Sequence, residues 1–165
     1  MASSKNRPMT SPALRKLSAG AGLAKNACFP PSRHMAYFLV IDDDNTIRQM
    51  MMAALEHAGH HVVEAATGEE GAAMFRACPT DVVITDILMP HDGIQSVIEL
   101  RQQFPAVPII VVSGLSAQSA HSQEVTGLLA PRRTLPKPFR LHDFLGVIDA
   151  VLSELNIPLP AAKKQ

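Results

Sequence analysis

The sequence predicts an α/β fold in which a parallel sheet is covered by helices on both faces. Short apolar runs alternate five times with segments of helical periodicity, which is typical of βαβ units with right-handed crossovers. The runs are apolar at consecutive positions, as expected for strands buried on both faces. Apolar residues make up 47% of the 165 residues and aromatic residues only 4%, so the expected core is large and aliphatic.

The five predicted strands are apolar runs bounded by turn signals. They are, in order, Tyr37–Ile41, His61–Ala65, Asp81–Asp86, Ile109–Val112 and Arg133–Pro136. Aspartates follow the first run, and Pro90 and Gly93 punctuate the turn after the third. Pro105 and Pro108 bracket the turn that precedes the fourth run.

The helical segments repeat apolar residues at three- and four-residue steps. Their expected extents are about Asn45–Ala58, Gly68–Ala77, Gly93–Phe104, Ala117–Leu129 and Leu141–Leu155. Gly59 supplies a left-handed stop for the first helix. Thr67 and Glu70 fit a capping box that opens the second.

We expect three parts along the chain: a disordered basic extension over 1–34, one domain over 35–156, and a solvated tail over 157–165. The first 34 residues hold six basic side chains and no acidic one. Their composition also resembles that of an organellar transit peptide. Another interpretation is that they are upstream sequence translated from a start codon before Met35.

The remaining 131 residues hold 9 basic and 15 acidic side chains, a net of −6, which argues against nucleic-acid binding. Two cysteines without a CxxC motif favour a reducing cytoplasm. We expect no membrane span, because no apolar run is long enough.

Four of the five predicted strands deliver a polar group to their carboxyl ends, where ligands collect in open α/β sheets. These groups are Asp42 and Asp43, Asp86, Ser113 and Lys137. Alone, Asp86 would be read as a residue that caps the next turn. Two carboxylates ~4 Å apart repel by about 4 kcal/mol at an effective dielectric of ~20, so the cluster needs a cation or shifted pKa values. Hard oxygen ligands with open positions favour Mg²⁺.

Four motifs in this order resemble the receiver domain of two-component response regulators, especially the stand-alone, chemotaxis-regulator-like type. They are Phe38–Asp43, Asp86–Pro90 with Asp92-Gly93, Val111–Gly114, and Leu135–Phe139. The resemblance covers about residues 36–155. It implies a flavodoxin-like, doubly wound, five-stranded parallel sheet with strand order 2-1-3-4-5 and helices on both faces.

The resemblance also implies a role for each site residue. Asp86 would be the phospho-acceptor, and Asp42 and Asp43 would hold Mg²⁺ together with Asp86 and the Leu88 backbone carbonyl. Ser113 would be the switch hydroxyl, and Lys137 would pair with the phosphoryl group and precede a cis Pro138.

The implied protein is a single-domain response regulator and not a turnover enzyme, with intrinsic autophosphatase chemistry. Its phosphoryl donor would be a sensor histidine kinase or a histidine phosphotransfer protein. Output would come through protein contact with an unknown target, from a monomer or weak dimer in the cytoplasm. Leu88 and Leu115 occupy the two positions that tune hydrolysis in the family, and their apolar side chains predict a long-lived acyl phosphate.

Three departures from the family pattern bear on switching. Only His91 separates Met89-Pro90 from Asp92-Gly93, so the loop is one residue short. Thr134 stands where the family often has an aromatic residue, and the stretch between Ser113 and Lys137 is slightly long. We expect the phosphoryl chemistry to survive these changes, whereas the signalling output is open.

Two alternatives differ in chemistry. Asp42, Asp44 and Thr46 fit the DxDxT signature of haloacid-dehalogenase-like phosphatases, with Asp42 as the nucleophile and Asp44 as the general acid. The paired acids expected downstream of the lysine are missing from that pattern. A pseudo-receiver would be a binding module that keeps the fold without phosphorylation.

His57, His60 and His61 lie close together in the sequence, at a helix end. We expect these three histidines to be solvated polar residues and not the ligands of a metal site.

Overall fold

The computed structural model describes residues 35–89, 93–114 and 119–157. The expected extension over 1–34 lies outside these residues, as do all but the first residue of the expected tail, Pro90–Asp92 of the short loop, and Leu115. The described elements are β1 (Tyr37–Ile41), α3 (Asn45–His57), β2 (His61–Ala65), α4 (Gly68–Ala77), β3 (Val82–Asp86), α5 (Gly93–Gln103), β4 (Ile109–Ser113), α6 (Ala120–Leu129), β5 (Arg133–Pro136) and α7 (Leu141–Glu154).

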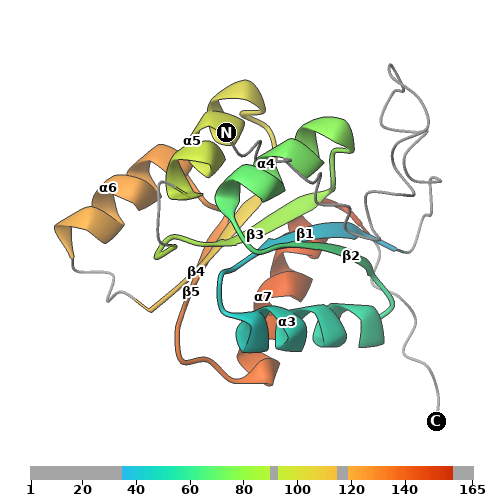
Figure 1. Cartoon of the computed structure of the whole chain (residues 1–165). Helices are drawn as coiled ribbons and strands as arrows, with labels where there is room; N and C mark the ends of the chain where they lie inside the picture. The colour runs from blue at the N-terminus through green and yellow to red at the C-terminus, as the bar shows by residue number, and fades with distance from the viewer. Residues whose placement is uncertain (1–34, 90–92, 115–118, 158–165) are drawn as a thin grey trace, which may run out of the picture. The chain divides into compact units, whose positions relative to one another are not determined.

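The five strands form one parallel sheet in the order β2-β1-β3-β4-β5, which confirms the expected topology. Each of β1, β3 and β4 is buried along its whole length, as the continuous apolar runs predicted. Helices α4, α5 and α6 cover one face of the sheet, and α3 and α7 cover the other (Figure 1). Among the described helices, none is long and apolar enough to cross a membrane.

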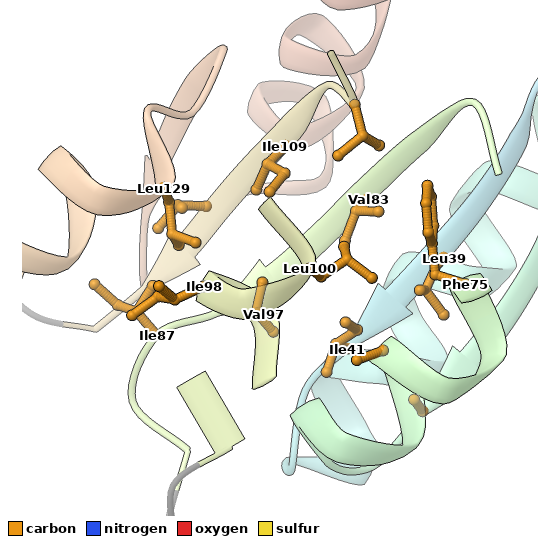
Figure 2. Close-up of a cluster of buried hydrophobic side chains, with 14 of the residues drawn as sticks. Leu39, Ile41, Phe75, Val83, Ile87, Val97, Ile98, Leu100, Ile109 and Leu129 are labelled. Carbon is orange, nitrogen blue, oxygen red and sulfur yellow. The ribbon is translucent and has the colours of Figure 1, made fainter. Parts of the chain in front are cut away.

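Alternate residues of β1, β2, β3 and β4 enter separate cores on the two faces, because successive side chains of a strand point in opposite directions. Leu39, Val83 and Ile109 pack with side chains of α4, α5 and α6 on one face (Figure 2). Phe38 and Ile84 pack with residues of α3 and α7 on the other. The two cores hold the central strands rigidly, and their carboxyl ends therefore have fixed positions.

Capping side chains account for the beginnings of α3 and α4. The Asp44 carboxylate accepts hydrogen bonds from the N–H groups of Thr46 (2.8 Å) and Ile47 (3.2 Å), which satisfies two donors of the first turn. The Thr67 hydroxyl accepts from the Glu70 N–H at 3.1 Å. The Glu70 carboxylate reaches back to the N–H of Ala66 and not to that of Thr67, one residue earlier than a standard capping box.

Element boundaries differ from prediction by a residue or so in several places. The third strand begins at Val82 and not at Asp81, whose carboxylate accepts from the Tyr37 N–H at 3.0 Å. The fourth strand extends through Ser113. The predicted helices over 93–104 and 141–155 each end one residue early, at Gln103 and Glu154, and α6 begins at Ala120.

The expectation that three neighbouring histidines are solvated is wrong for one of them. His60 is 5% exposed, its Nδ1 accepts from the Ala36 N–H at 3.3 Å, and its ring meets Phe38 edge to face. Helix α3 ends at His57, and Gly59 at φ 90° turns the chain back so that His60 enters the core before β2 begins. His57 and His61 are exposed, as predicted.

Candidate phosphoryl-acceptor site

The site lies where β1 and β3, neighbours in the sheet, both end in an aspartate. Asp42 directly follows β1, and Asp86 is the last residue of β3. Both side chains are buried, with residue exposures of 0% and 5%. Parallel pairing of the two strands places these carboxylates at one edge of the sheet.

A lysine from the far end of the chain joins the two carboxylates. Lys137 follows β5, and its Nζ lies 2.7 Å from Oδ2 of Asp42 and 2.7 Å from Oδ2 of Asp86. The N–H of Lys137 also donates to the Ser113 carbonyl at 2.8 Å, which anchors the lysine to the end of β4. The peptide bond between Lys137 and Pro138 is cis, as expected.

Backbone N–H groups bond to the second oxygen of each buried carboxylate. The Leu88 N–H donates to Oδ1 of Asp86 at 2.8 Å. The Asp44 N–H donates to Oδ1 of Asp42 at 2.9 Å. Each aspartate therefore uses one oxygen for a backbone donor and the other for the ammonium group.

The electrostatics of the cluster favour an additional cation. Burial raises the pKa of the Asp42 carboxyl above its usual range, and the bonds to Lys137 and to the Asp44 N–H offset this only in part. Burial alone would lower the pKa of Lys137, but its bonds to Asp42 and Asp86 outweigh burial and raise that pKa. Three carboxylates against one ammonium leave an excess of negative charge.

The donor set fits Mg²⁺. One carboxylate oxygen from each of Asp42, Asp43 and Asp86 lies within 4.8 Å of the others. All three are hard oxygen donors, and the exposed Asp43 leaves one side of the cluster open to water. The sequence prediction that Asp42, Asp43 and Asp86 come together is confirmed.

The other predicted site residues lie around this cluster. Ser113 is buried at 3% exposure at the end of β4. Leu88 is 41% exposed, and its Cδ1 lies 4.0 Å from the position that a Cβ on Gly114 would take, as does the Cβ of Lys137. The exposed Leu88 side chain thus approaches Gly114, at the end of β4, as the Cβ of Lys137 does. Thr134 is exposed on β5.

The geometry does not favour the phosphatase alternative. Its general acid would be Asp44, but that carboxylate caps α3 by accepting from the N–H groups of Thr46 and Ile47. Its nucleophile, Asp42, is fully buried and held by Lys137. Asp143, downstream of the lysine, lies exposed in the first turn of α7.

Sequence reasoning missed two residues beside the cluster. Arg48 of α3 donates through Nη1 to the Asp42 carbonyl oxygen at 2.7 Å and through Nε to Glu64 of β2 at 2.8 Å. The sequence offered one indication of this role, which is that Arg48 lies one turn into the helix after the acidic loop. The pairing with Glu64 was not apparent, because Glu64 lies 16 residues further along the chain.

Comparisons with known proteins agree with the fold and show the family. Residues 38–149 match the family model of the response regulator receiver domain. The chain is 31% identical over 121 residues to the response regulator receiver protein CpdR of Brucella abortus, covering 72% of this chain and 98% of that protein. It is 34% identical over 116 residues to the response regulator MprA of Mycolicibacterium vanbaalenii, covering 69% of this chain and about half (49%) of MprA.

Solved structures give the same result. The chemotaxis protein CheY4 of Vibrio cholerae superimposes with a TM-score of 0.65 at 31% identity, over 72% of this chain and 99% of that one. A CheY-like receiver domain from Methanospirillum hungatei gives a TM-score of 0.67 at 25% identity, over 74% of this chain and 97% of that one.

The chain belongs to the receiver-domain family of two-component response regulators. Members of this family are phospho-acceptors in signal transduction and not classical turnover enzymes, and they act with a histidine kinase or phosphotransfer partner.

Proposed function

We propose that this chain is a response regulator receiver domain that accepts a phosphoryl group on Asp86. The observation that carries the proposal is the position of Lys137 Nζ, 2.7 Å from carboxylate oxygens of both Asp42 and Asp86. An ammonium group at this point faces the oxygen that would attack phosphorus. It is therefore placed to stabilise the charge that develops on the transferring group.

The transfer step forms one bond and breaks one. A carboxylate oxygen of Asp86 attacks the phosphorus of a phosphohistidine, an O–P bond forms, and the N–P bonding pair stays on the imidazole nitrogen. The Leu88 N–H, bonded to Oδ1, holds the Asp86 carboxylate in one orientation. In this proposal the Ser113 hydroxyl donates to a phosphoryl oxygen, and Lys137 moves from Asp86 toward the phosphoryl group.

Asp42, Asp43, Asp86 and the Leu88 carbonyl are the proposed ligands of the Mg²⁺ ion. When bound, the ion neutralises charge on the phosphoryl oxygens. Support comes from the three hard oxygen donors within 4.8 Å of one another and from the raised pKa of Asp42, which indicates that burial penalises its negative charge.

Output through protein contact, location in the cytoplasm, a monomeric or weakly dimeric state, and the absence of nucleic-acid binding belong to the same proposal. The net charge of −6 over residues 35–165 supports the last point, because nucleic-acid binding needs a basic face.

The test of the acceptor uses the purified full chain with Mg²⁺ and radiolabelled acetyl phosphate or a phosphorylated histidine kinase. We expect label on the wild type that base and hydroxylamine remove, as for an acyl phosphate, and none on Asp86→Asn. Loss of label in Asp42→Asn with retention in Asp86→Asn would instead support the phosphatase alternative. A wild type that takes no label from either donor would support the pseudo-receiver. Asp143→Asn, an exposed carboxylate on α7, is the matched control and should label normally.

Intrinsic autophosphatase activity is the finer part of the proposal, and we expect it to be slow. The exposed Leu88 side chain has no group that can orient an attacking water. Leu88→Asn should shorten the half-life of the labelled protein severalfold, because the amide can hold a water near phosphorus. An unchanged half-life in Leu88→Asn, with Leu128→Asn on α6 as the exposed-leucine control, would contradict this role.

A further inference from the structure

Arg48 contacts three different parts of the chain beside the site. Its Nη1 donates to the Asp42 carbonyl at 2.7 Å, its Nε to Glu64 Oε2 at 2.8 Å, and its Nη2 to Asn45 Oδ1 at 2.9 Å. The Arg48 side chain is only 11% exposed, so water competes weakly for these bonds. A planar guanidinium group can satisfy several acceptors at once, which an ammonium group cannot do in the same geometry.

The bond to the Asp42 carbonyl bears directly on Asp43. The Asp42 carbonyl belongs to the peptide unit that ends at the nitrogen of Asp43, and that unit is planar. Fixing the carbonyl direction therefore fixes where the Asp43 backbone starts. Asp42 itself is held through its backbone and its side chain. Its N–H donates to the Ala65 carbonyl at 3.2 Å, and its Oδ1 accepts from the Asp44 N–H.

Asp43 depends on this backbone restraint. Its carboxylate is exposed, and no other described residue donates a hydrogen bond to it, in contrast to the buried Asp42 and Asp86. The direction in which Asp43 projects is thus set by the peptide that Arg48 holds. Unlike Asp42 and Asp86, the Asp43 carboxylate is therefore positioned through its backbone, which the bond between Arg48 and the Asp42 carbonyl restrains.

Glu64 in turn holds the guanidinium group. It lies on β2 in register with Val40 of β1, and its Oε2 accepts from Arg48 and from Gln49 Nε2 at 2.9 Å. The chain of contacts therefore runs from the edge strand β2, through the first turn of α3, to the acidic loop. Each link is a direct hydrogen bond between described residues.

We propose that Arg48, oriented by Glu64, is a positioning residue that preorganises the acidic loop for a divalent cation, an inference that rests on the proposed function. Outer-shell residues that orient metal ligands typically change affinity by about 10–100-fold when they are removed. Arg48 contacts neither the cation nor the phosphoryl group in this scheme. Its effect is expected on the Mg²⁺ affinity of the folded protein.

The experiment measures the Mg²⁺ dissociation constant of the ¹⁵N-labelled full chain from amide shift changes during MgCl₂ titration, without a phosphoryl donor. We expect the dissociation constant to rise about tenfold in Arg48→Met. Arg48→Lys should give a smaller rise, since an ammonium group can reach the Asp42 carbonyl or Glu64 but not hold both. Glu64→Gln should give a rise of about threefold, because a neutral amide orients the guanidinium less strongly.

Arg76→Met is the matched control. Arg76 is exposed on α4 and its Nε bonds only to Gln103 Oε1, at 2.9 Å, away from the acidic loop. Its Mg²⁺ dissociation constant should equal that of the wild type. Urea unfolding of every variant separates affinity from stability, since a merely structural Arg48 would lower the unfolding midpoint and leave the Mg²⁺ affinity of the folded protein unchanged.

The outcomes separate the inference from the function on which it rests. Weaker Mg²⁺ binding in the Arg48 and Glu64 variants, with Arg76→Met unchanged, supports the inference. Wild-type affinity in folded Arg48→Met and Arg48→Lys overturns it while leaving the proposed function intact. If Arg48→Met does not fold, Arg48→Lys and Glu64→Gln decide in the same way. A wild type that shows no saturable Mg²⁺ binding overturns the metal site and the inference together.

Discussion

Several charged or polar side chains in this molecule lie in buried or partly buried positions, where each forms hydrogen bonds to a neighbouring carboxylate or backbone group. Lys137 is held by two buried carboxylates, and Arg101 donates to the carbonyls of Leu129 and Val107 at 2.7 and 2.6 Å. His60 is a further case, because its buried ring accepts from a backbone N–H. Buried groups of this kind couple folding to protonation, since the folded and unfolded chains hold their protons with different strength.

His60 gives a pH dependence whose sign follows from its burial. Burial lowers the pKa of His60 below its ordinary value of 6.5, and the nearby Asp149 charge offsets this in part. As the pH falls through 6.5, the unfolded chain takes up a proton before the folded protein does. The free energy of unfolding therefore decreases as the pH decreases. We expect the urea midpoint of the wild type to fall more steeply from pH 7.5 to 5.5 than that of His60→Asn.

The asparagine amide oxygen can replace Nδ1 as the acceptor for Ala36 without titrating, which keeps the variant comparable. His61→Asn should reduce the wild-type slope only in part, because the charge of neighbouring His61 is a minor cause of the lowered pKa of His60. Equal slopes for His60→Asn and the wild type would show that His60 does not contribute.

At the scale of elements, close packing of α4 against β1 holds the strand that leads into the site. A Cβ added at Gly71 of α4 would lie 2.4 Å from Cδ1 and 2.7 Å from Cγ1 of Ile41, the residue directly before Asp42. Such distances are well inside van der Waals contact, so the helix can approach the strand only because position 71 is glycine. Ile41 and Gly71 are thus matched across this interface.

We expect Gly71→Ala to lower the free energy of unfolding by up to about 2 kcal/mol. Overpacking of about 1–3 kcal/mol outweighs the roughly 1 kcal/mol gain in helix propensity. In an Ile41→Val background, which lacks Cδ1, the cost should shrink by about 1 kcal/mol, and a double-mutant cycle by urea unfolding measures this coupling. Additive effects would contradict the packing argument.

Gly146→Ala on α7 is the control for propensity alone. A Cβ added at Gly146 would meet nothing within 4 Å, and the residue is exposed. This substitution should raise the free energy of unfolding by up to about 1 kcal/mol.

The elements themselves were largely predictable, and the reasons are local. Three strands, Tyr37–Ile41, His61–Ala65 and Arg133–Pro136, begin and end where the apolar runs and turn residues predicted. The burial of His60 and the bond between Arg48 and Glu64 were not predictable, because they depend on how α3 packs against β1 and β2. The strand order came from the family resemblance, since periodicity carries no information about which strands are neighbours.

At the scale of the whole molecule, folding and cation binding are linked. An ion that binds the assembled acidic cluster and not the unfolded chain stabilises the fold by RT ln(1 + [L]/Kd). At ten times the dissociation constant, Mg²⁺ should raise the free energy of unfolding by about 1.4 kcal/mol. Urea unfolding at matched ionic strength, with and without MgCl₂, measures this increase.

Asp43→Ala removes the exposed member of the cluster and should abolish most of that stabilisation, while Asp149→Ala, an exposed carboxylate of α7, should keep it. Equal Mg²⁺ stabilisation of the wild type and Asp43→Ala would place the ion elsewhere.

The ion pairs of Lys137 also make the site a reporter of completed folding. The pair with Asp86 closes 51 residues of chain, and the pair with Asp42 closes 95. Until β5 has docked against β4, the buried carboxylates of β1 and β3 face each other without the ammonium group that joins them. A nascent or partly unfolded copy in which β5 is not docked therefore lacks the ammonium group at the acidic cluster, and under the proposed function it would not be a competent acceptor.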